Sequence, residues 1–398
     1  MPHLIVVAAL FILAAGWGFA AELQAGDFWF RGPLGSDGAS IRKLGPNHFE
    51  LLLGHAPKHP DWANNVQFEI RQNAKGNPLR LEVAFNHPKP TMLFDEYPPS
   101  WSHDGENWCR IPWKKGGTPG IRRTLEFPVF TGDRVVVGNQ VPMSYEQAER
   151  LIANWRRHPH FTATVIGNSL EGRNLYRLTV TDSDSPYPPG RRWVHHIANQ
   201  HAGEGVAVWR IAGMIDWLLS DAAAGHRRRT ICHFTLQMSP DSPSHGWYRV
   251  NADGIDMNRS YRVAGADPAR QPHEAYVFQH DLEQLMRSEA PLITSWSMHG
   301  WPGPMDPYLV GVGPEFGTAV GPWPELAARL ASYDTSRPRL SNPLRQWPVR
   351  DPKKWSPYCW DDGVFLQFGI TNALVEGGGD CHSKEQSRNV GAALMRAM

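Results

Sequence analysis

Four apolar segments of the chain lead into side chains that bind metals or take part in catalysis. In open α/β sheets ligands bind outside the carboxyl ends of the strands, so residues far apart in the sequence meet when each closes a neighbouring strand. We therefore expect a sheet whose strand ends build one metal-centred site. The side chains are His201 and Glu204 after "RRWVHHIAN", Arg249 to Arg259 in "WYRVNADGIDMNR", His299 after "LITSWSM" and Glu376 after "TNALV".

Length and charge limit the number of domains and the kind of partner. At 398 residues the chain exceeds one typical domain, and a guide of roughly 150 residues per domain favours two. The 40 basic and 39 acidic residues nearly cancel, and no long basic run is present, so a nucleic-acid partner is not expected. The 17 Trp, 34 Pro and 37 Gly residues favour a β-rich module with many turns.

The first twenty residues, "MPHLIVVAALFILAAGWGFA", are apolar and end in small residues. The stretch is short for a membrane span, so we interpret residues 1–20 as the cleaved signal peptide of an exported (periplasmic or extracellular) protein. Because no Lys or Arg precedes the apolar run, an uncleaved N-terminal membrane anchor is the alternative. No stable membrane span is expected after cleavage, because the later apolar run from Val206 to Leu219 contains Arg210 and Asp216.

Residues 21–142 show the two-residue alternation of β-strands, as in 66–70 and 79–85. The segments "TLEFPVF" and "RVVVGNQV" are predicted to be two further strands joined by the turn residues Thr131, Gly132 and Asp133. This pattern predicts an antiparallel β-sandwich domain, which we interpret as an accessory module without chemistry of its own.

At Ser144 the periodicity becomes helical, which places the domain boundary before residues 143–398. Ser144 is a predicted N-cap, and the spacing of Ala148, Ile152 and Trp155 predicts one apolar helix face. Beyond this helix, strands alternate with helices, which predicts an α/β domain with a mixed, largely parallel sheet flanked by helices. Further helices are predicted over about 203–220, 272–289, 322–333 and 383–398.

The strand-end side chains suit zinc chemistry. His201 and Glu204 stand three apart where a strand gives way to a helix, so that an imidazole and a carboxylate can face one ion. Two His and one carboxylate are the usual ligands of a catalytic zinc with a position open for water, and His299 is the third ligand in this hypothesis. Glu376 ends an apolar run before three glycines, and a buried carboxylate without a partner favours a functional role.

The order and spacing of these segments resemble the zinc carboxypeptidase family. The resemblance rests on "GNSLEGRNLYRLTV", "HAGE", "PDSPSHGWYRVNADGIDMNR", "SMHG" and "NALVE", and covers roughly residues 145 to 398. The N-terminal part, with "SWSHDGENW" and "PMSY", is similar to the N-terminal module of the cytosolic-carboxypeptidase branch. The resemblance implies one bound Zn²⁺ ion and the zinc carboxypeptidase fold.

The resemblance also implies roles by position. His201, Glu204 and His299 match the family's zinc ligands, and Glu376 matches its catalytic glutamate. Arg249 matches the arginine that polarises the scissile carbonyl. The substrate-binding set comprises Asn258 and Arg259, which would hold the terminal carboxylate, and Tyr358, which would close over the substrate.

The chain departs from the family pattern at positions that carry no reacting group. Ala202 and Gly203 replace commoner residues between the first two ligands, and Met257 replaces a leucine. These departures bear on the shape of the cleft wall rather than on the chemistry.

The implied function is hydrolysis of the C-terminal peptide bond of peptides or proteins by a zinc-activated water, with Glu376 as general base. Two other hypotheses stay open. One is a zinc amidase or deacylase on the same scaffold, acting on cell-wall peptides or N-acyl amino acids. The other is a non-catalytic peptide or glycan binder.

Two sets of charged residues are candidates for selecting the terminal residue of the substrate, and the sequence does not decide between them. Asp361 and Asp362 would select a basic terminal residue if they line the pocket, but solvated loop carboxylates explain them equally well. A basic pocket would instead select an acidic residue, and the candidates are Arg345, Arg350, Lys353 and Lys354.

The cysteines match no zinc-finger or redox spacing. An exported protein can form one or two disulfides, and a bridge between Cys359 and Cys381 is one option. The remaining two are Cys109 and Cys232.

Overall fold

The computed structural model describes most of the chain. Its described residues are 21–90, 99–111, 122–300, 308–312, 323–335, 345–346, 355–378 and 383–398. Residues 1–20, the predicted signal peptide, lie outside them. Among the described helices none is long and apolar enough to cross a membrane.

The N-terminal region is a β-sandwich, as predicted. Its two sheets bury a common core that includes Phe49, Phe68 and Val137. One sheet has the order β1 (Phe28–Trp29), β6 (Phe68–Ile70), β11 (Val135–Asn139), β8 (Pro99–Ser102) and β9 (Cys109–Arg110). The other has the order β10 (Arg122–Phe127), β7 (Leu79–Ala84), β3 (His48–Leu52) and β2 (Ser40–Gly45), and β4 (His55–Ala56) pairs with β5 (His59–Ala63). The pairing is antiparallel except between β3 and β7, which run parallel.

The two strands predicted on either side of Thr131 to Asp133 are both present, but they do not pair with each other. β10 pairs with β7, whereas β11 pairs with β6 and β8 in the opposite sheet. Leu125 on β10 and Val135 on β11 both face the shared core, so the short connection crosses from one sheet to the other. A turn sequence shows that the chain reverses but does not show which strand each arm pairs with.

An eight-stranded mixed sheet forms the centre of the C-terminal region, which confirms the predicted fold class. The four central strands β15, β14, β16 and β19 run parallel, and β12, β13 and β17 add antiparallel pairs. The strand order is β12 (Phe161–Asn168), β13 (Asn174–Thr181), β15 (Thr230–Thr235), β14 (Trp193–Ala198), β16 (Thr294–Met298), β19 (Thr371–Glu376), β17 (Tyr308–Val312) and β18 (Arg345–Gln346).

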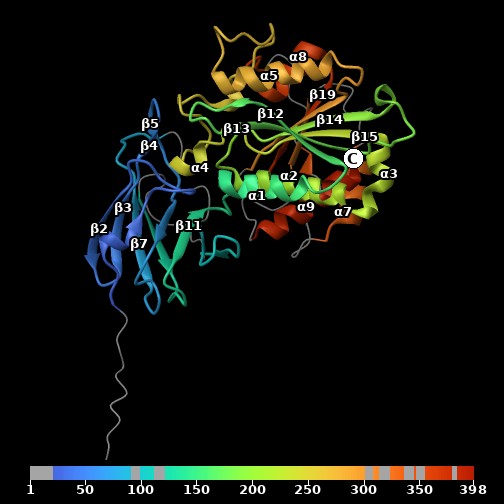
Figure 1. Cartoon of the computed structure of the whole chain (residues 1–398). Coiled ribbons are helices and arrows are strands. Elements are labelled where there is room, and N and C mark those ends of the chain that lie inside the picture. The colour runs from blue at the N-terminus through green and yellow to red at the C-terminus, as the bar shows by residue number, and fades with distance from the viewer. Residues whose placement is uncertain are drawn as a thin grey trace, which may run out of the picture.

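Helices cover both faces of this sheet (Figure 1). On one face lie α1 (Tyr145–Trp155), α2 (Gly205–Leu219), α3 (Ala224–Arg229), α7 (Trp323–Tyr333) and α9 (Lys384–Ala397). On the other lie α5 (His273–Met286) and α8 (Trp360–Phe368). Alternate residues of β14 explain the two layers, because Ile197 packs into the core on the α2 side and Val194 into the core on the α5 side.

Local sequence signals explain where α1 begins. The Ser144 hydroxyl accepts a hydrogen bond from the Gln147 N–H at 3.2 Å, and the Gln147 amide oxygen accepts one from the Ser144 N–H at 3.0 Å. This capping box satisfies two backbone donors that the helix leaves unpaired. Ala148, Ile152 and Trp155 are buried, as their spacing predicts.

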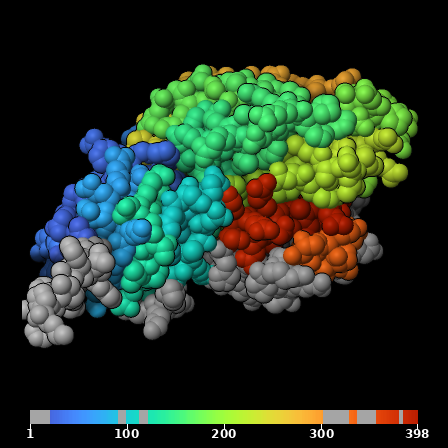
Figure 2. Space-filling view, turned by 60° about the horizontal axis from the view of Figure 1, so that its bottom comes forward, coloured from blue at the N-terminus to red at the C-terminus, as the bar shows by residue number. Residues whose placement is uncertain are grey.

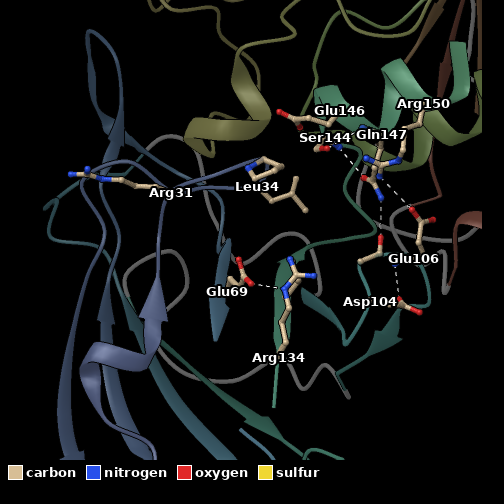
Figure 3. A pocket seen from close by; sticks show the side chains of 13 residues that line it. Arg31, Leu34, Glu69, Asp104, Glu106, Arg134, Ser144, Glu146, Gln147 and Arg150 are labelled. Carbon is tan, nitrogen blue, oxygen red and sulfur yellow. Dashed lines mark hydrogen bonds and ion pairs between the residues drawn. The ribbon is translucent and has the colours of Figure 1, made fainter. Parts of the chain in front are cut away.

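The sandwich packs against the α/β region along several contacts. The Gly35 N–H donates to the Pro243 carbonyl at 3.1 Å, and Asp37 pairs with His245 at 2.7 Å, so both bind the short helix α4 (Ser242–His245). Near α1 the two parts enclose a cavity of about 250 Å³, where the Gln147 amide donates to the Gly105 carbonyl at 2.9 Å (Figure 3). The C-terminal helix (red in Figure 2) also lies against the sandwich, through an ion pair between Lys384 and Glu106.

Two buried histidines on β14 make the fold sensitive to acid. Burial lowers the pKa of His195 to about 3 and that of His196 to about 4. Their exposed fractions are 1% and 6%, and their Nδ1 atoms face the hydroxyls of Thr294 and Ser295. Both are therefore neutral in the folded protein at neutral pH and must gain a proton when the chain unfolds in mild acid.

We expect stability to be full above the unfolded-state pKa of about 6.5 and to fall as the pH drops towards 4, because the unfolded state binds more protons. His196 alone should cost about 2 kcal/mol between pH 7 and pH 5. Urea unfolding of His196→Gln should show a shallower pH dependence than the wild type. An equal pH dependence in both proteins would contradict this role.

Candidate metal and substrate site

The carboxyl end of the central sheet brings three predicted metal ligands together. His201 and Glu204 lie in the loop between β14 and α2, and His299 directly follows β16. One ligand atom from each of the three lies within 4.8 Å of the others, and all three side chains are buried. Two imidazoles and one carboxylate in this arrangement suit a zinc ion with an open coordination position.

The Glu204 carboxylate sits between the two imidazoles. Its Oε1 lies 2.8 Å from His201 Nδ1, and its Oε2 lies 2.9 Å from His299 Nδ1. Burial alone would raise the pKa of Glu204, but the two histidines lower it well below its usual range. The carboxylate is therefore charged, as a metal ligand has to be.

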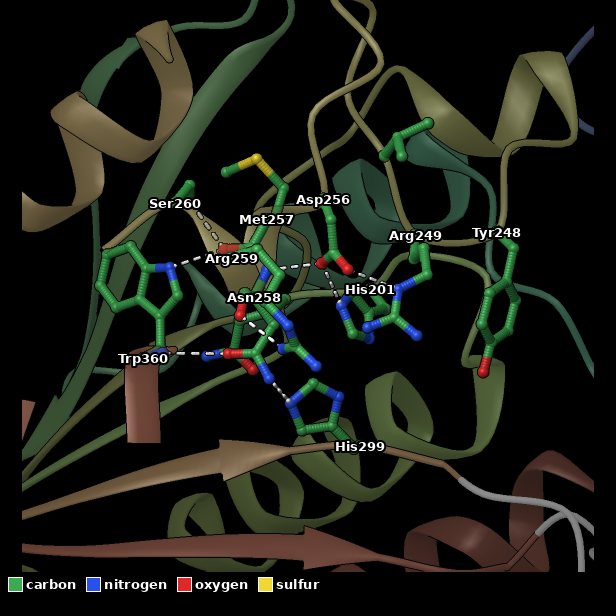
Figure 4. A network of polar contacts seen from close by, with 12 residues as sticks. His201, Tyr248, Arg249, Asp256, Met257, Asn258, Arg259, Ser260, His299 and Trp360 are labelled. Atoms are coloured by element: carbon green, nitrogen blue, oxygen red, sulfur yellow. Dashed lines mark hydrogen bonds and ion pairs between the residues drawn. The ribbon is translucent and has the colours of Figure 1, made fainter. Parts of the chain in front are cut away.

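Asp256 links His201 to Arg249 (Figure 4). Its Oδ1 lies 3.0 Å from His201 Nε2, and its Oδ2 accepts a hydrogen bond from Arg249 Nε at 2.8 Å. A carboxylate on the far nitrogen of an imidazole fixes the tautomer that leaves Nδ1 free for a metal. The sequence alone does not single out Asp256, although its place two residues before Asn258 is an available signal.

The Arg249 segment lies at the site but does not close a strand, so that part of the prediction is wrong. After β15 the chain passes through α4 and a loop whose only pairing among the described residues is the isolated bridge Val250 to Asp256. The Asn251 amide oxygen accepts the backbone N–H groups of Asp253 and Ile255 at 3.1 and 3.0 Å. These side-chain bonds replace ladder pairing, which is the usual behaviour of Asn in turns.

Asn258 and Arg259 follow Asp256 in a single 3₁₀ turn. The Asn258 amide nitrogen lies 3.4 Å from His299 Nε2, and its oxygen accepts the Trp360 N–H at 3.0 Å. The Arg259 guanidinium donates to the Asn258 carbonyl at 2.7 Å and belongs to an exposed residue. A guanidinium held beside the metal ligands yet open to solvent can bind a substrate carboxylate.

Glu376 is the last residue of β19, next to His299. β16 and β19 pair in parallel with Met298 opposite Val375, and the His299 N–H donates to the Val375 carbonyl at 2.7 Å. The Glu376 Oε2 atom is buried without a hydrogen-bond partner. Burial, reinforced by the Glu204 charge, raises the pKa of Glu376 to about 7 against the opposing effect of His299 and Arg249. A carboxyl in this range can take up and release a proton near neutral pH.

The structure bears differently on the three sets of residues that were predicted to contact the substrate around α8. Tyr358 is 59% exposed, with its carbonyl accepting the Tyr261 N–H, and its contact with substrate stays a prediction. Asp361 and Asp362 are 2% and 0% exposed in the first turn of α8, so the interpretation as solvated loop carboxylates is wrong. Arg345 lies in β18, and Arg350, Lys353 and Lys354 lie outside the described residues.

The suggested bridge between Cys359 and Cys381 is not formed. Cys359 is a free, buried thiol at the N-cap of α8, and Cys381 lies outside the described residues. Cys109 and Cys232 are free as well. Cys232 lies on β15 and is buried in the hydrophobic core, so apolar packing accounts for its presence there.

Comparison with known proteins finds similarity to the same family over part of the chain. Residues 149–299 match the zinc carboxypeptidase family. Cytosolic carboxypeptidase 2 of Xenopus tropicalis is 25% identical over 249 residues, which are 55% of this chain and 25% of that protein. Cytosolic carboxypeptidase 2 of Mus musculus is 32% identical over 254 residues, 56% of this chain and 29% of that protein. The chain therefore spans under a third of the length of these curated relatives.

Solved structures share the fold over nearly the whole chain. A metallo-carboxypeptidase from Burkholderia cenocepacia superposes with a TM-score of 0.70 at 20% identity, covering 92% of this chain and 96% of that one. A metallo-carboxypeptidase from Pseudomonas aeruginosa, solved in complex with (2-guanidinoethylmercapto)succinic acid, gives 0.69 at 18% identity with coverages of 90% and 94%. Coverage of this extent includes the β-sandwich as well as the α/β region.

Removing the charge of Asp256 should weaken zinc binding. Asp256→Asn loses the carboxylate that orients His201, and loss of such an outer partner typically costs about 10- to 100-fold in metal affinity. Competition with a chromogenic chelator measures the zinc dissociation constant. Asp267→Asn, which changes a half-exposed carboxylate paired with Arg270, is the matched control. Equal affinities in both variants would show that Asp256 does not orient the ligand.

Proposed function

We propose that this protein, which contains a zinc carboxypeptidase domain, hydrolyses the C-terminal peptide bond of peptides or proteins. The proposal is supported by two kinds of group that lie together at the carboxyl edge of the sheet, namely metal ligands with a carboxyl beside them and two guanidiniums. A His–Glu–His ligand set lies beside Glu376, a carboxyl with a pKa raised to about 7. The guanidiniums of Arg249 and Arg259 come from the neighbouring loop (Figure 4).

Glu376 supports the role of general base. His201, Glu204 and His299 would hold the zinc ion, which would lower the pKa of a bound water so that a hydroxide-like nucleophile is available near neutral pH. Glu376 would accept the proton of that water at Oε2 and deliver it to the leaving amine. Its buried Oε2 has no competing hydrogen bond, which supports this assignment.

The two arginines support different parts of the reaction. Arg249 is held by Asp256 through Nε, which leaves the two terminal nitrogens of its guanidinium to stabilise the developing oxyanion. Arg259, with Asn258 beside it, would pair with the free carboxylate of the substrate and so restrict cleavage to chain ends. The product would be a single C-terminal amino acid.

The buried Asp361 supports a preference for Lys or Arg as the released residue. It is 2% exposed in the first turn of α8, and its charge helps, after burial and the Glu204 charge, to raise the pKa of Glu376, so it lies near the reacting groups. Peptides that differ only in their last residue distinguish this preference from an acidic one. Faster release of acidic residues would instead favour a pocket lined by the basic candidates, which are Arg345, Arg350, Lys353 and Lys354.

Export of the protein is a further proposal, supported by the apolar sequence of residues 1–20. Mass spectrometry of the mature N-terminus in the producing cell would identify cleavage after this segment or its retention as an anchor.

Peptides with free and amidated C-termini test the function. We expect release of single residues from the free form, at least about 100-fold slower release from the amidated form because Arg259 loses its partner, and loss of both with a chelator. Equal hydrolysis of both forms would favour the amidase or deacylase hypothesis. Peptide binding without hydrolysis by the zinc-loaded protein would favour a binder.

Glu376→Gln should retain zinc and lose turnover. The amide has nearly the same shape as the carboxyl but cannot accept the proton, and general-base catalysis typically contributes about 100- to 10,000-fold. Zinc content and kcat are measured on the same sample. The surface change Glu289→Gln is the control, and a Glu376→Gln rate equal to that of the control would remove Glu376 from the mechanism.

A further inference from the structure

The strongest unassigned feature at the site is Tyr248, the residue before Arg249. Its side chain is buried, and its hydroxyl donates a hydrogen bond to Glu204 Oε1 at 2.9 Å. Its carbonyl accepts the N–H of Gly203 at 2.8 Å. Tyr248 therefore contacts the metal-ligand loop twice, once at a ligand and once at the backbone beside it.

Gly203 is required by this contact. A Cβ atom on Gly203 would lie 2.5 Å from the Tyr248 carbonyl oxygen, 2.7 Å from its Cα and 2.8 Å from its ring carbon Cδ2. Side-chain carbons do not approach backbone atoms this closely, so any larger residue would push the two loops apart. The glycine between the ligands is thus explained by close approach of backbone to backbone.

Both oxygens of Glu204 have a donor that is not a metal ligand. Oε1 accepts the Tyr248 hydroxyl, and Oε2 accepts the Gly300 N–H at 2.9 Å. The contacts of these oxygens with His201 and His299 must change when an ion enters between them, whereas the hydroxyl and the N–H can stay. These two donors can therefore hold the carboxylate plane in both the empty and the occupied site.

We propose that Tyr248 and Gly203 form a lock that orients the Glu204 carboxylate for zinc and places Arg249 against it. Tyr248 is then a positioning residue. The inference rests on the proposed zinc site and deepens it, because one loop–loop contact would set both the metal affinity and the location of the arginine.

The test compares zinc binding in Tyr248→Phe and in a matched control. Tyr276→Phe removes a hydroxyl from α5, which carries none of the proposed metal ligands, and should bind zinc like the wild type. Tyr248→Phe keeps the ring and loses the hydrogen bond, so we expect zinc affinity to fall by about 10- to 100-fold. Saturating zinc should then restore most of kcat/KM, since no reacting group is lost. A zinc dissociation constant within twofold of the control would overturn the proposal.

The Gly203 half of the lock has its own control. Gly203→Ala should weaken zinc at least as much as Tyr248→Phe and should also lower kcat at saturating zinc, because Arg249 moves with the loop. Gly225→Ala is the control, since a Cβ there meets nothing within 4 Å. Wild-type affinity and kcat in Gly203→Ala would overturn the close-approach argument. Zinc affinity is measured without substrate, so this outcome is distinct from a failure of the peptidase proposal.

An independent observation concerns the opposite end of the sheet. A cavity of about 590 Å³ opens where β14 and β15 begin, beside the end of α9. The metal ligands follow the other end of β14, about 20 Å away at the usual rise per strand residue. This cavity therefore belongs to a different site from the one already described.

The cavity is basic and aromatic. Four arginines line it, and none of its described lining residues is an Asp or a Glu. The residues Tyr187 and Trp193 are 41% and 53% exposed, and His226 Nε2 has no hydrogen-bond partner. The arginines are Arg191, Arg229, Arg329 and Arg396.

We infer that this cavity binds a small organic polyanion with a planar ring, of the nucleoside polyphosphate type. Its volume is that of a typical ligand pocket. Guanidiniums pair with phosphate oxygens, and an exposed Trp or Tyr ring offers a surface for stacking. No described ion pair involves Arg191 or Arg229, which are therefore available to a ligand.

Calorimetry with ATP, adenosine and pyrophosphate tests this site. We expect ATP to bind at least tenfold more tightly than either fragment, and the double variant Arg191→Gln/Arg229→Gln to lose at least tenfold in affinity. The control is Arg228→Gln, whose arginine pairs with Asp182 outside the cavity. No ATP binding, binding unaffected by the double variant, or equal binding of pyrophosphate would overturn the inference.

Discussion

The charge of Glu204 is the constraint on which the site depends. Its carboxylate is only 4% exposed, and a buried charge is costly unless partners surround it. The partners come from three separate segments: His201 on the same loop, His299 and Gly300 after β16, and Tyr248 before Arg249. The start of α2, the end of β16 and the long loop after β15 must therefore all be in place together.

Asp256 is a second carboxylate beside this site, and it connects His201 to Arg249. It accepts hydrogen bonds from His201 and Arg249, and burial is outweighed by these two groups, so the pKa of Asp256 is lowered. Glu204, His201, Asp256 and Arg249 thus form one continuous chain of polar contacts. An ion added to the ligand set would thus enter a region whose fixed charges already hold each neighbour in position.

The β-sandwich supports this arrangement from the side. Gly35 and Asp37 bind α4, and His59 contacts the Gly254 carbonyl at 2.8 Å, so the loop that carries Arg249 is held at both ends by the N-terminal region. The interpretation of that region as an accessory module without reacting groups is consistent with these contacts, yet they also give it a part in positioning the site. Solved structures that match over 90% or more of the chain share this two-part plan.

Periodic and local signals made most of the fold predictable. The three-to-four residue spacing in α1 and α2, the Ser144 cap and the short apolar strands β14, β16 and β19 are properties of neighbouring residues, and the structure has them within a few residues of the predicted bounds. Pairing across the sandwich was not predictable, because the turn after β10 is compatible with strands in one sheet or in two. The burial of Asp361 was likewise not predictable from the sequence, because it depends on how α8 packs.

By itself the sequence determined the chemistry of the site. His201, Glu204, His299, Arg249 and Glu376 are of residue types and in an order that suit the proposed metal-dependent hydrolysis. Only the tertiary structure decided which atoms face each other: that Asp256 joins His201 to Arg249, and that Tyr248 reaches Glu204 across Gly203. The reason is that residue type fixes what a side chain can donate or accept, whereas partners distant in the sequence are chosen by strand register and by the space that packing leaves.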